Sequence, residues 1–188
     1  MIERPILFSG SMVEALLAGT KSQTRRVYKP RHPEPYEYVQ DGVPYRDYDG
    51  EVSAVLCPHG QHGDRLWVRE KWAHEDSWYG KETASFKNCY VPDRGYTWIT
   101  YAADIVSPAE VPDRWRPSIF MPRWASRLTL EVRSVRVERL QEISEADARA
   151  EGTADRAAYA HLWDKINAKR APWASDPWVW VVEFRRLS

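Results

Sequence analysis

Three apolar stretches of the chain have the pattern of β-strands. Ile2–Phe8 is short and broken by Pro5, which lacks a backbone N–H, so we expect a strand at the edge of a sheet. Residues 127–140 alternate apolar and polar side chains, but the alternation changes phase near Ser134, which predicts a β-bulge or a bend. Residues 178–184 begin apolar on both faces, as is typical of a central strand.

Three further segments have the spacing of amphipathic helices. We expect helices over 11–18, between the capping-box pair Ser11 and Glu14 and the stop signal Gly19, over 144–151, between the N-cap Ser144 and Gly152, and over 154–167. The apolar stripe of the third helix consists of Tyr159, Leu162, Trp163 and Ile166. His161 lies outside this stripe, so we expect it on the surface.

Two long segments interrupt this pattern. Residues 29–63 contain five prolines with tyrosines between them, and the turn signal Asp49-Gly50 predicts a short hairpin within 38–55. Residues 73–97 are polar and irregular up to a short predicted strand that begins at Trp98. With 188 residues in total, we expect a single domain of the α+β class spanning residues 1–188, with loop insertions at 29–63 and 73–97.

Residues that commonly bind zinc lie in the first insertion. Cys57, His59 and His62 follow one another closely, and Cys89 could supply a further ligand. The spacing matches no standard zinc finger, because the two histidines lie in a Gly/Pro turn without a second pair of ligands. We therefore predict no metal at these residues, and no cofactor.

Composition narrows the functional classes. The 27 Lys and Arg residues balance 27 Asp and Glu residues, which argues against tight nonspecific binding to duplex nucleic acid. Two cysteines are too few for a disulfide scaffold, and no stretch resembles a transmembrane helix or a signal peptide, so we expect a soluble cytoplasmic protein. Between 114 and 139, seven arginines face two acids, which fits either the wet face of a strand pair or a groove for a phosphate backbone.

The strand predicted over 66–72 carries one unexpected carboxylate. Side chains alternate along a strand, so Glu70 shares a face with Leu66 and Val68. A carboxylate at the end of an apolar row needs a partner, because burial of an unpaired charge is costly. Glu70 therefore either forms a salt bridge with a neighbouring arginine or lies in a pocket.

The most reactive combination of side chains follows the first predicted helix. Gly19 ends that helix, so the polar residues after it are expected on a fixed but exposed turn. Lys21 and Thr24 could act as base and nucleophile. Arg25 and Arg26 could hold a phosphate or a carbonyl oxygen. The alternative is a solvated basic loop.

Together these segments resemble the ASCH domain family. The matching motifs are G-x-K-x-x-T-x-R at 19–26, the G-D-x-hydrophobic-x-V-R-E strand at 63–70, and an apolar final strand that follows a helix. The additional segments at 57–58, 115–119, 121–126 and 176–178 resemble the longer, phage- and prophage-encoded branch. The resemblance covers nearly the whole chain and implies a PUA-like small β-barrel with flanking helices.

The resemblance also implies a reaction. Small amidohydrolases of the family remove the acetyl group of N4-acetylcytidine with a lysine and a threonine of the G-x-K-x-x-T segment and a glutamate elsewhere. Here these correspond to Lys21, Thr24 and Glu70, which we expect to converge on one cleft, with Glu75 and Glu131 as alternatives for the glutamate. Thr24 would attack the acyl carbon, a neutral Lys21 would accept its proton, and Glu70 would return a proton to the cytosine amine.

The neighbouring residues would complete a nucleoside site. Arg25 or Arg26 would lower the pKa of Lys21 by their positive charge, and Trp67 or Trp72 would stack on the base. The expected partner is thus a modified cytosine nucleoside, or an RNA that contains one. Two alternatives remain open: an RNA-binding module or ribonuclease that uses the same cleft, and a phage accessory protein without catalysis that binds a modified nucleotide or a host protein.

Overall fold

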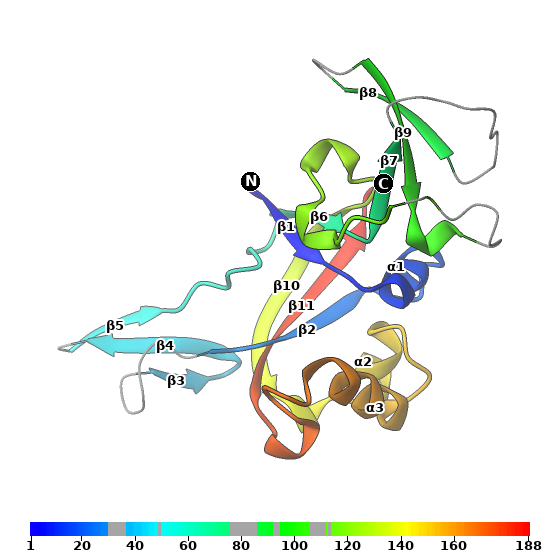
Figure 1. Ribbon diagram of the computed structural model, residues 1–188. Coiled ribbons are helices and arrows are strands. Elements are labelled where there is room, and N and C mark those ends of the chain that lie inside the picture. Colours follow the sequence, from blue (N-terminus) through cyan, green and yellow to red (C-terminus); the bar gives the residue numbers. More distant parts are fainter. Residues whose placement is uncertain (30–36, 49, 76–85, 92–94, 106–111, 113) are drawn as a thin grey trace.

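The chain folds as a mixed α+β structure, as predicted. Its computed structural model describes residues 1–29, 37–48, 50–75, 86–91, 95–105, 112 and 114–188 (Figure 1). The strands are β1 (Glu3–Leu7), β2 (Gln23–Val27), β3 (Glu37–Gln40), β4 (Val43–Tyr48), β5 (Glu51–Ala54), β6 (Arg65–Arg69), β7 (Trp72–Glu75), β8 (Phe86–Val91), β9 (Gly95–Tyr101), β10 (Thr129–Arg139) and β11 (Trp178–Arg186). The helices are α1 (Gly10–Leu17), α2 (Glu145–Ala150) and α3 (Arg156–Asn167), and short 3-10 turns include η1 (Ala102–Asp104), η3 (Ser118–Phe120) and η4 (Arg123–Ala125).

The central sheet has the strand order β1-β6-β10-β11-β2. β1 pairs with β6 in parallel and lies at an edge, and β11 lies between β10 and β2, so both sequence predictions for these strands are confirmed. The hydrogen-bonded ladder among the described strands ends at β1 and β2 and does not close into a barrel. The two edges nevertheless meet, because Nη2 of Arg26 in β2 donates a hydrogen bond of 2.6 Å to the carbonyl oxygen of Leu7 in β1.

The predicted irregularity near Ser134 is confirmed. The register between β10 and β11 shifts between Val132 and Ser134, where one extra residue enters β10. A bulge of this kind bends the strand and increases the twist of the sheet. It explains why the apolar residues of this segment change phase while the strand remains continuous.

Apolar cores lie on both faces of β11. Trp180, Val182 and Phe184 belong to one buried cluster, which α1 joins through Val13 and Leu16. Val179 and Val181 belong to the other, which includes residues of α2 and α3. Burial on both faces accounts for the nearly continuous apolar sequence of this strand.

The ends of α1 differ in how well the sequence predicts them. Ser9, and not Ser11, is the N-cap of α1, and it makes no side-chain capping bond, so the predicted capping box at Ser11 is wrong. The predicted end of the helix is confirmed: Gly19 has φ +75°, and the Thr20 N–H donates to the Ala15 carbonyl oxygen at 2.9 Å, as in a Schellman motif.

In α2 and α3 the caps follow the sequence more closely. Ser144 is the N-cap of α2, as predicted, and exchanges hydrogen bonds with Asp147. Tyr159 and Trp163 of α3 are buried, and His161 is exposed, as expected. Ile166 is the exception, because 51% of its surface is exposed. It therefore does not belong to the apolar face.

Two small sheets extend from the central one. β3, β4 and β5 form an antiparallel sheet that includes the predicted hairpin and projects away from the helices (Figure 1). The Val137 N–H of β10 donates to the Gly42 carbonyl oxygen at 2.7 Å and joins this sheet to the body. β7, β9 and β8 form the other small sheet, so the expectation that residues 73–97 are irregular is wrong.

Candidate functional site

The polar segment after α1 is a buried strand, so the expectation of an exposed turn is wrong. Gln23–Val27 forms β2, which pairs with β11, and Lys21 forms an isolated bridge with Glu151. Lys21, Gln23, Thr24 and Arg25 are each less than 5% exposed. The sequence pattern is misleading here because a polar strand can be buried only where acidic partners, distant in the sequence, meet it.

Lys21 is bound directly to Glu151 at the end of α2. Its Nζ donates to Oε2 of Glu151 at 2.6 Å and to the carbonyl oxygen of the same residue at 2.8 Å. The side chain of Lys21 is fully removed from solvent. Burial lowers the pKa of Lys21 below its usual value, although the charge and the hydrogen bond of Glu151 act in the opposite direction.

Arg25 extends this arrangement into a buried polar cluster, which consists of Lys21, Arg25, Glu138, Asp147 and Glu151. Nε of Arg25 donates to Glu138 at 3.1 Å, and Nη2 lies 3.4 Å from Asp147. Nη1 of the same guanidinium lies 3.4 Å from the second carboxylate oxygen of Glu151. The Arg25 side chain has no exposed surface, so it serves the cluster and is not open to a phosphate.

The other face of β2 carries Thr24 and Arg26. Strand alternation places these two residues opposite Gln23 and Arg25. The Arg26 guanidinium lies 5.2 Å from the centre of the Phe8 ring, and Nζ of Lys21 lies 5.6 Å from it. No hydrogen bond joins Lys21 to Thr24, both of which the structure describes. The predicted base and nucleophile are thus close in sequence but not hydrogen-bonded to each other.

Glu70 is buried, as the strand alternation predicted, and an arginine binds it. Its two carboxylate oxygens accept hydrogen bonds from Nε and Nη2 of Arg127 at 2.9 and 3.0 Å. Arg127 also donates to Asp104 at 2.6 Å. Burial by itself would lower the pKa of Arg127, but its hydrogen bonds with Glu70 and Asp104 raise it. Lys21 and Glu70 thus each have a strong partner of opposite charge.

The alternative glutamates and the predicted stacking residues have other surroundings. Glu131 pairs with Arg185 at 2.7 Å near the surface, and the side chain of Glu75 lies outside the described part of the structure. Trp67 and Trp72 are 8% and 2% exposed, so their rings are used mainly in packing. The Trp72 ring meets Trp124 edge-to-face with centroids 5.8 Å apart.

Much of the arginine-rich segment is neutralised by carboxylates. Among the described residues, four arginines of this segment form ion pairs: Arg123 with Glu3, Arg127 with Glu70 and Asp104, Arg133 with Glu131, and Arg136 with Glu138, Asp147 and Glu183. Of the two interpretations of this segment, these contacts favour arginines on the solvent-exposed face of a strand pair over a groove for a phosphate backbone. A continuous groove for a phosphate backbone would need unpaired cations.

The residues considered for zinc lie beside the central sheet. Nδ1 of His62 is 2.7 Å from the Arg133 carbonyl oxygen. Burial raises the pKa of the Cys57 thiol to about 11, and burial together with the charge of Arg26 lowers the pKa of His59 to about 4. Within the described residues, no three or more His, Cys, Asp or Glu side chains are grouped to hold a metal ion.

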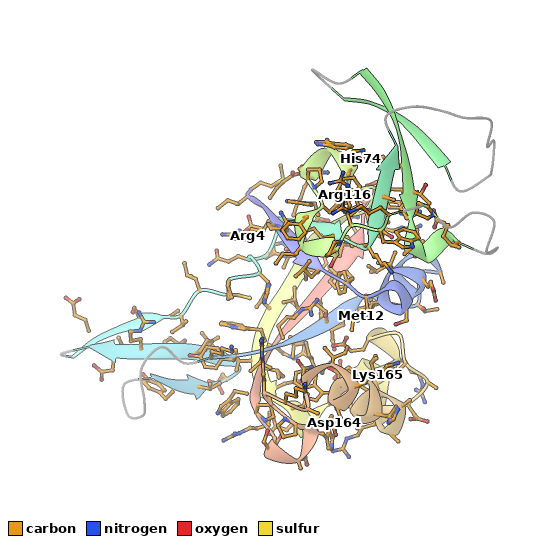
Figure 2. The ribbon with its side chains drawn as sticks, in the orientation of Figure 1. Arg4, Met12, His74, Arg116, Asp164 and Lys165 are labelled. Atoms are coloured by element: carbon orange, nitrogen blue, oxygen red, sulfur yellow. The ribbon has the colours of Figure 1, made fainter. Side chains whose placement is uncertain are left out.

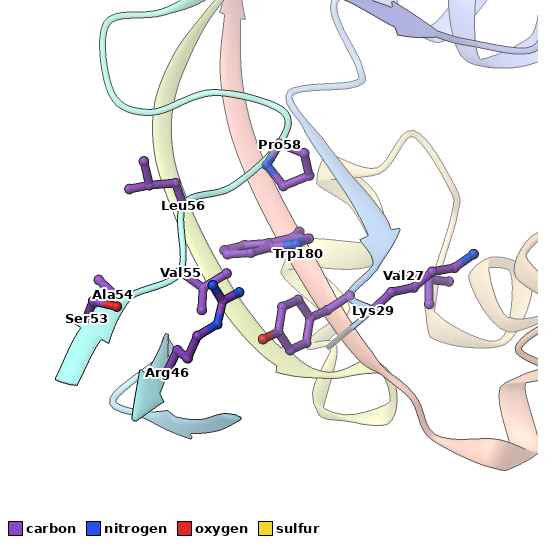
Figure 3. A pocket seen from close by; sticks show the side chains of 10 residues that line it. Val27, Lys29, Arg46, Ser53, Ala54, Val55, Leu56, Pro58 and Trp180 are labelled. Carbon is purple, nitrogen blue, oxygen red and sulfur yellow. The ribbon is translucent and has the colours of Figure 1, made fainter. Parts of the chain in front are cut away.

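A cavity of about 430 Å³ opens beyond the far end of β2 (Figure 3). Its described walls consist of Val27, Tyr28, Lys29, Arg46, Ser53, Ala54, Val55, Leu56, Pro58 and Trp180. The Tyr28 and Trp180 rings meet at 90° with centroids 5.3 Å apart and form its aromatic side. The volume falls within the range of small-molecule sites, and none of the predicted catalytic side chains lines it.

Sequence reasoning missed the acidic half of the buried polar cluster. Glu151 is 130 residues from Lys21, and Glu138 is 113 residues from Arg25. The sequence indicates only where α2 ends, because Glu151 directly precedes Gly152. This glycine has a φ of +88° at the end of the helix. Nothing in the sequence indicates which strand this helix end meets.

No helix among the described residues combines the length and the apolar character needed to cross a membrane. Comparisons with models of known protein families, with curated proteins and with solved structures gave no match.

Proposed function

We propose that this protein is an amidohydrolase that removes the acyl group from N4-acylated cytosine nucleosides. The observation that carries the proposal is the environment of Lys21, a lysine without exposed surface, whose pKa is lowered by burial and which lies 2.6 Å from a carboxylate. General bases of this kind need a pKa closer to neutrality than that of an exposed lysine.

The fold proposed with this activity is a PUA-like barrel. Two features support it: the bulge at Ser134, which curves the sheet, and the hydrogen bond from Arg26 to Leu7, which links the two edge strands. In such a barrel Thr24 and Arg26 would face the interior, because strand alternation places them on the side of β2 opposite Gln23 and Arg25.

In the proposed reaction, protons move between Glu151, Lys21 and the substrate. Glu151 takes a proton from the Lys21 ammonium and leaves a neutral amine. Thr24 Oγ1 attacks the acyl carbon while its proton passes to that amine, and the resulting Lys21 ammonium gives this proton to the cytosine nitrogen, which leaves as a neutral amine when the C–N bond breaks. Water then hydrolyses the acyl–threonine ester. Lys21 must turn from Glu151 towards Thr24 for this step, since no hydrogen bond joins the two at rest.

Glu70 has a binding role in the proposal. Because both its oxygens accept hydrogen bonds from Arg127, its geometry is fixed and suits an acceptor for the exocyclic amine. This replaces the expected role of proton donor. Glu70→Gln would turn an acceptor into a donor beside Arg127, so substrate binding should weaken more than the chemical step.

The test is turnover of N4-acetylcytidine followed by ultraviolet absorbance. We expect Lys21→Met and Thr24→Val each to lower kcat/KM by about 100-fold or more, as for the loss of general-base or nucleophilic catalysis. Lys165→Met is the matched control, because Lys165 is exposed on α3 (Figure 2). Circular dichroism would establish that each variant is folded at the assay temperature.

Two results would overturn the proposal. One is absence of turnover by the unmodified chain across acetyl, propionyl and benzoyl cytidines. The other is wild-type turnover by folded Lys21→Met.

A further inference from the structure

Large apolar side chains are exposed on the 3-10 turns η3 and η4. Phe120 is 70% exposed, Ile119 56% and Trp124 38%. The segment is nevertheless well anchored, because Met121 and Ala125, which alternate with these residues, are both 1% exposed. Exposed aromatic residues on a fixed segment indicate a binding surface more strongly than isolated exposed leucines do.

Cations and tryptophans alternate around these turns. The Arg69 guanidinium lies 4.6 Å from the Trp67 ring centre, and Nζ of Lys71 lies 5.1 Å from that of Trp115. Arg116, which is labelled in Figure 2, lies 5.7 Å from the Trp72 ring centre. Arg116 and Lys71 are both exposed, so their charges remain accessible to an anion.

Two hydrogen-bond donors at the same place have no acceptor. Among the buried side-chain nitrogen and oxygen atoms that the structure describes, Nε of Arg69 and Nε1 of Trp72 lack a partner. Both groups can only donate, and unsatisfied buried donors are rare in folded proteins. They show that hydrogen-bond donors outnumber acceptors at this end of β6 and β7.

We propose that the surface formed by Arg69, Lys71, Arg116, Ile119, Phe120 and Trp124 binds single-stranded nucleic acid. Phe120 and Trp124 offer rings on which unpaired bases stack, and Arg116 and Lys71 provide the charge for the adjoining phosphates. A duplex keeps its bases stacked internally and cannot use these rings. The surface lies at the opposite end of the molecule from α2 and α3 (Figure 1) and is independent of the proposed catalysis.

The test is fluorescence anisotropy with a labelled 12-nucleotide single-stranded RNA, its DNA counterpart and the RNA duplex. We expect both single strands to bind more tightly than the duplex. Phe120→Ala should weaken single-strand binding by about 5- to 100-fold, as for the loss of one stacked base. Arg116→Gln with Lys71→Gln should lower the slope of log K against log salt by about 0.7 for each lost phosphate contact.

Matched controls come from α3, where Ile166→Ala removes an apolar side chain of similar exposure and Lys165→Gln removes an exposed charge. Neither should change RNA affinity. A labelled polyglutamate peptide tests the alternative of an acidic protein partner. The proposal is overturned if this peptide binds as tightly as RNA, if the duplex binds as tightly as the single strand, or if Phe120→Ala binds RNA as the unmodified chain does.

Discussion

At the scale of single residues, buried charges with defined partners distinguish this molecule. Lys21 with Glu151 and Arg127 with Glu70 are both nearly free of solvent. A buried pair contributes little net stability compared with apolar residues of the same volume, whereas removal of one partner leaves an isolated charge. In terms of stability, the pairs therefore serve more to fix which segments meet than to add free energy of folding.

The Lys21–Glu151 pair gives a direct prediction about stability. Lys21→Met leaves the Glu151 carboxylate buried without its partner, so the free energy of unfolding should fall by about 3–5 kcal/mol. The double variant Lys21→Met, Glu151→Leu should recover most of that loss, because both members of the pair are removed and Arg25 keeps Glu138 and Asp147 as partners. Urea denaturation of both variants and the unmodified chain measures the difference. Equal urea midpoints for Lys21→Met and the unmodified chain would show that the pair is not formed.

His59 should make stability depend on pH. Burial, with the charge of Arg26, lowers its pKa to about 4 in the folded state, whereas an unfolded histidine has a pKa of about 6.5. The unfolded chain therefore binds more protons between these values, and stability falls as the pH decreases from about 6.5 to 4. Because the ring is half-buried, we expect a loss on the order of 2 kcal/mol.

The measurement is urea denaturation at several pH values between 4.5 and 7. His59→Gln should show a flatter dependence than the unmodified chain, while carboxylates contribute equally to both. Identical profiles for the two proteins would contradict a buried, neutral His59.

At the scale of elements, the end of α2 is packed closely against α1 and β2. A Cβ atom at Gly152 would lie 2.9 Å from the Ala15 Cβ and 3.4 Å from the Lys21 Cβ. Only glycine permits this approach together with a φ of +88°. The contact holds Glu151 in front of Lys21, so the position of the ion pair depends on the absence of a side chain at Gly152.

Gly152→Ala should therefore lower the free energy of unfolding by more than the backbone strain of a positive φ alone would. Gly19 provides the comparison, since its φ of +75° is similar but a Cβ atom there would meet nothing within 4 Å. We expect about 1 kcal/mol for Gly19→Ala and at least about 2 kcal/mol for Gly152→Ala. Thermal and urea unfolding of both variants would measure this difference in stability. Equal losses would mean that the helix end can move away from α1.

At the scale of the whole molecule, the balance of charge determines how the protein behaves in solution. The 27 basic and 27 acidic side chains give a net charge of zero at pH 7. Proteins without net charge repel one another least, so solubility should be lowest near neutral pH and higher at about pH 5.5 or 8.5. Precipitation by polyethylene glycol measures this. Replacing Lys165 and Lys169 by Glu should move the minimum to lower pH.

Most strands could be predicted from the sequence because their pattern is local. The alternation around Leu66 and the change of phase at Ser134 both depend on neighbouring residues, and both are confirmed. The surroundings of Lys21 could not be predicted, because its partners come from a helix 130 residues away. The prediction of the start of α1 was wrong for another reason. Ser9 and Ser11 both suit an N-cap, and the helix already begins at Gly10.

The position of β11 in the middle of the sheet has a consequence for synthesis. Gln23 of β2 and Glu183 of β11 are 160 residues apart, and at about 5–20 residues per second a ribosome needs roughly 8–30 s to make that length. Throughout that time β2 is an open strand without its partner. Exposed apolar edges of this kind recruit other chains, whereas charged ones do so much less. The polar side chains of Gln23, Arg25 and Arg26 should therefore lower the tendency of the nascent chain to aggregate before β11 is made.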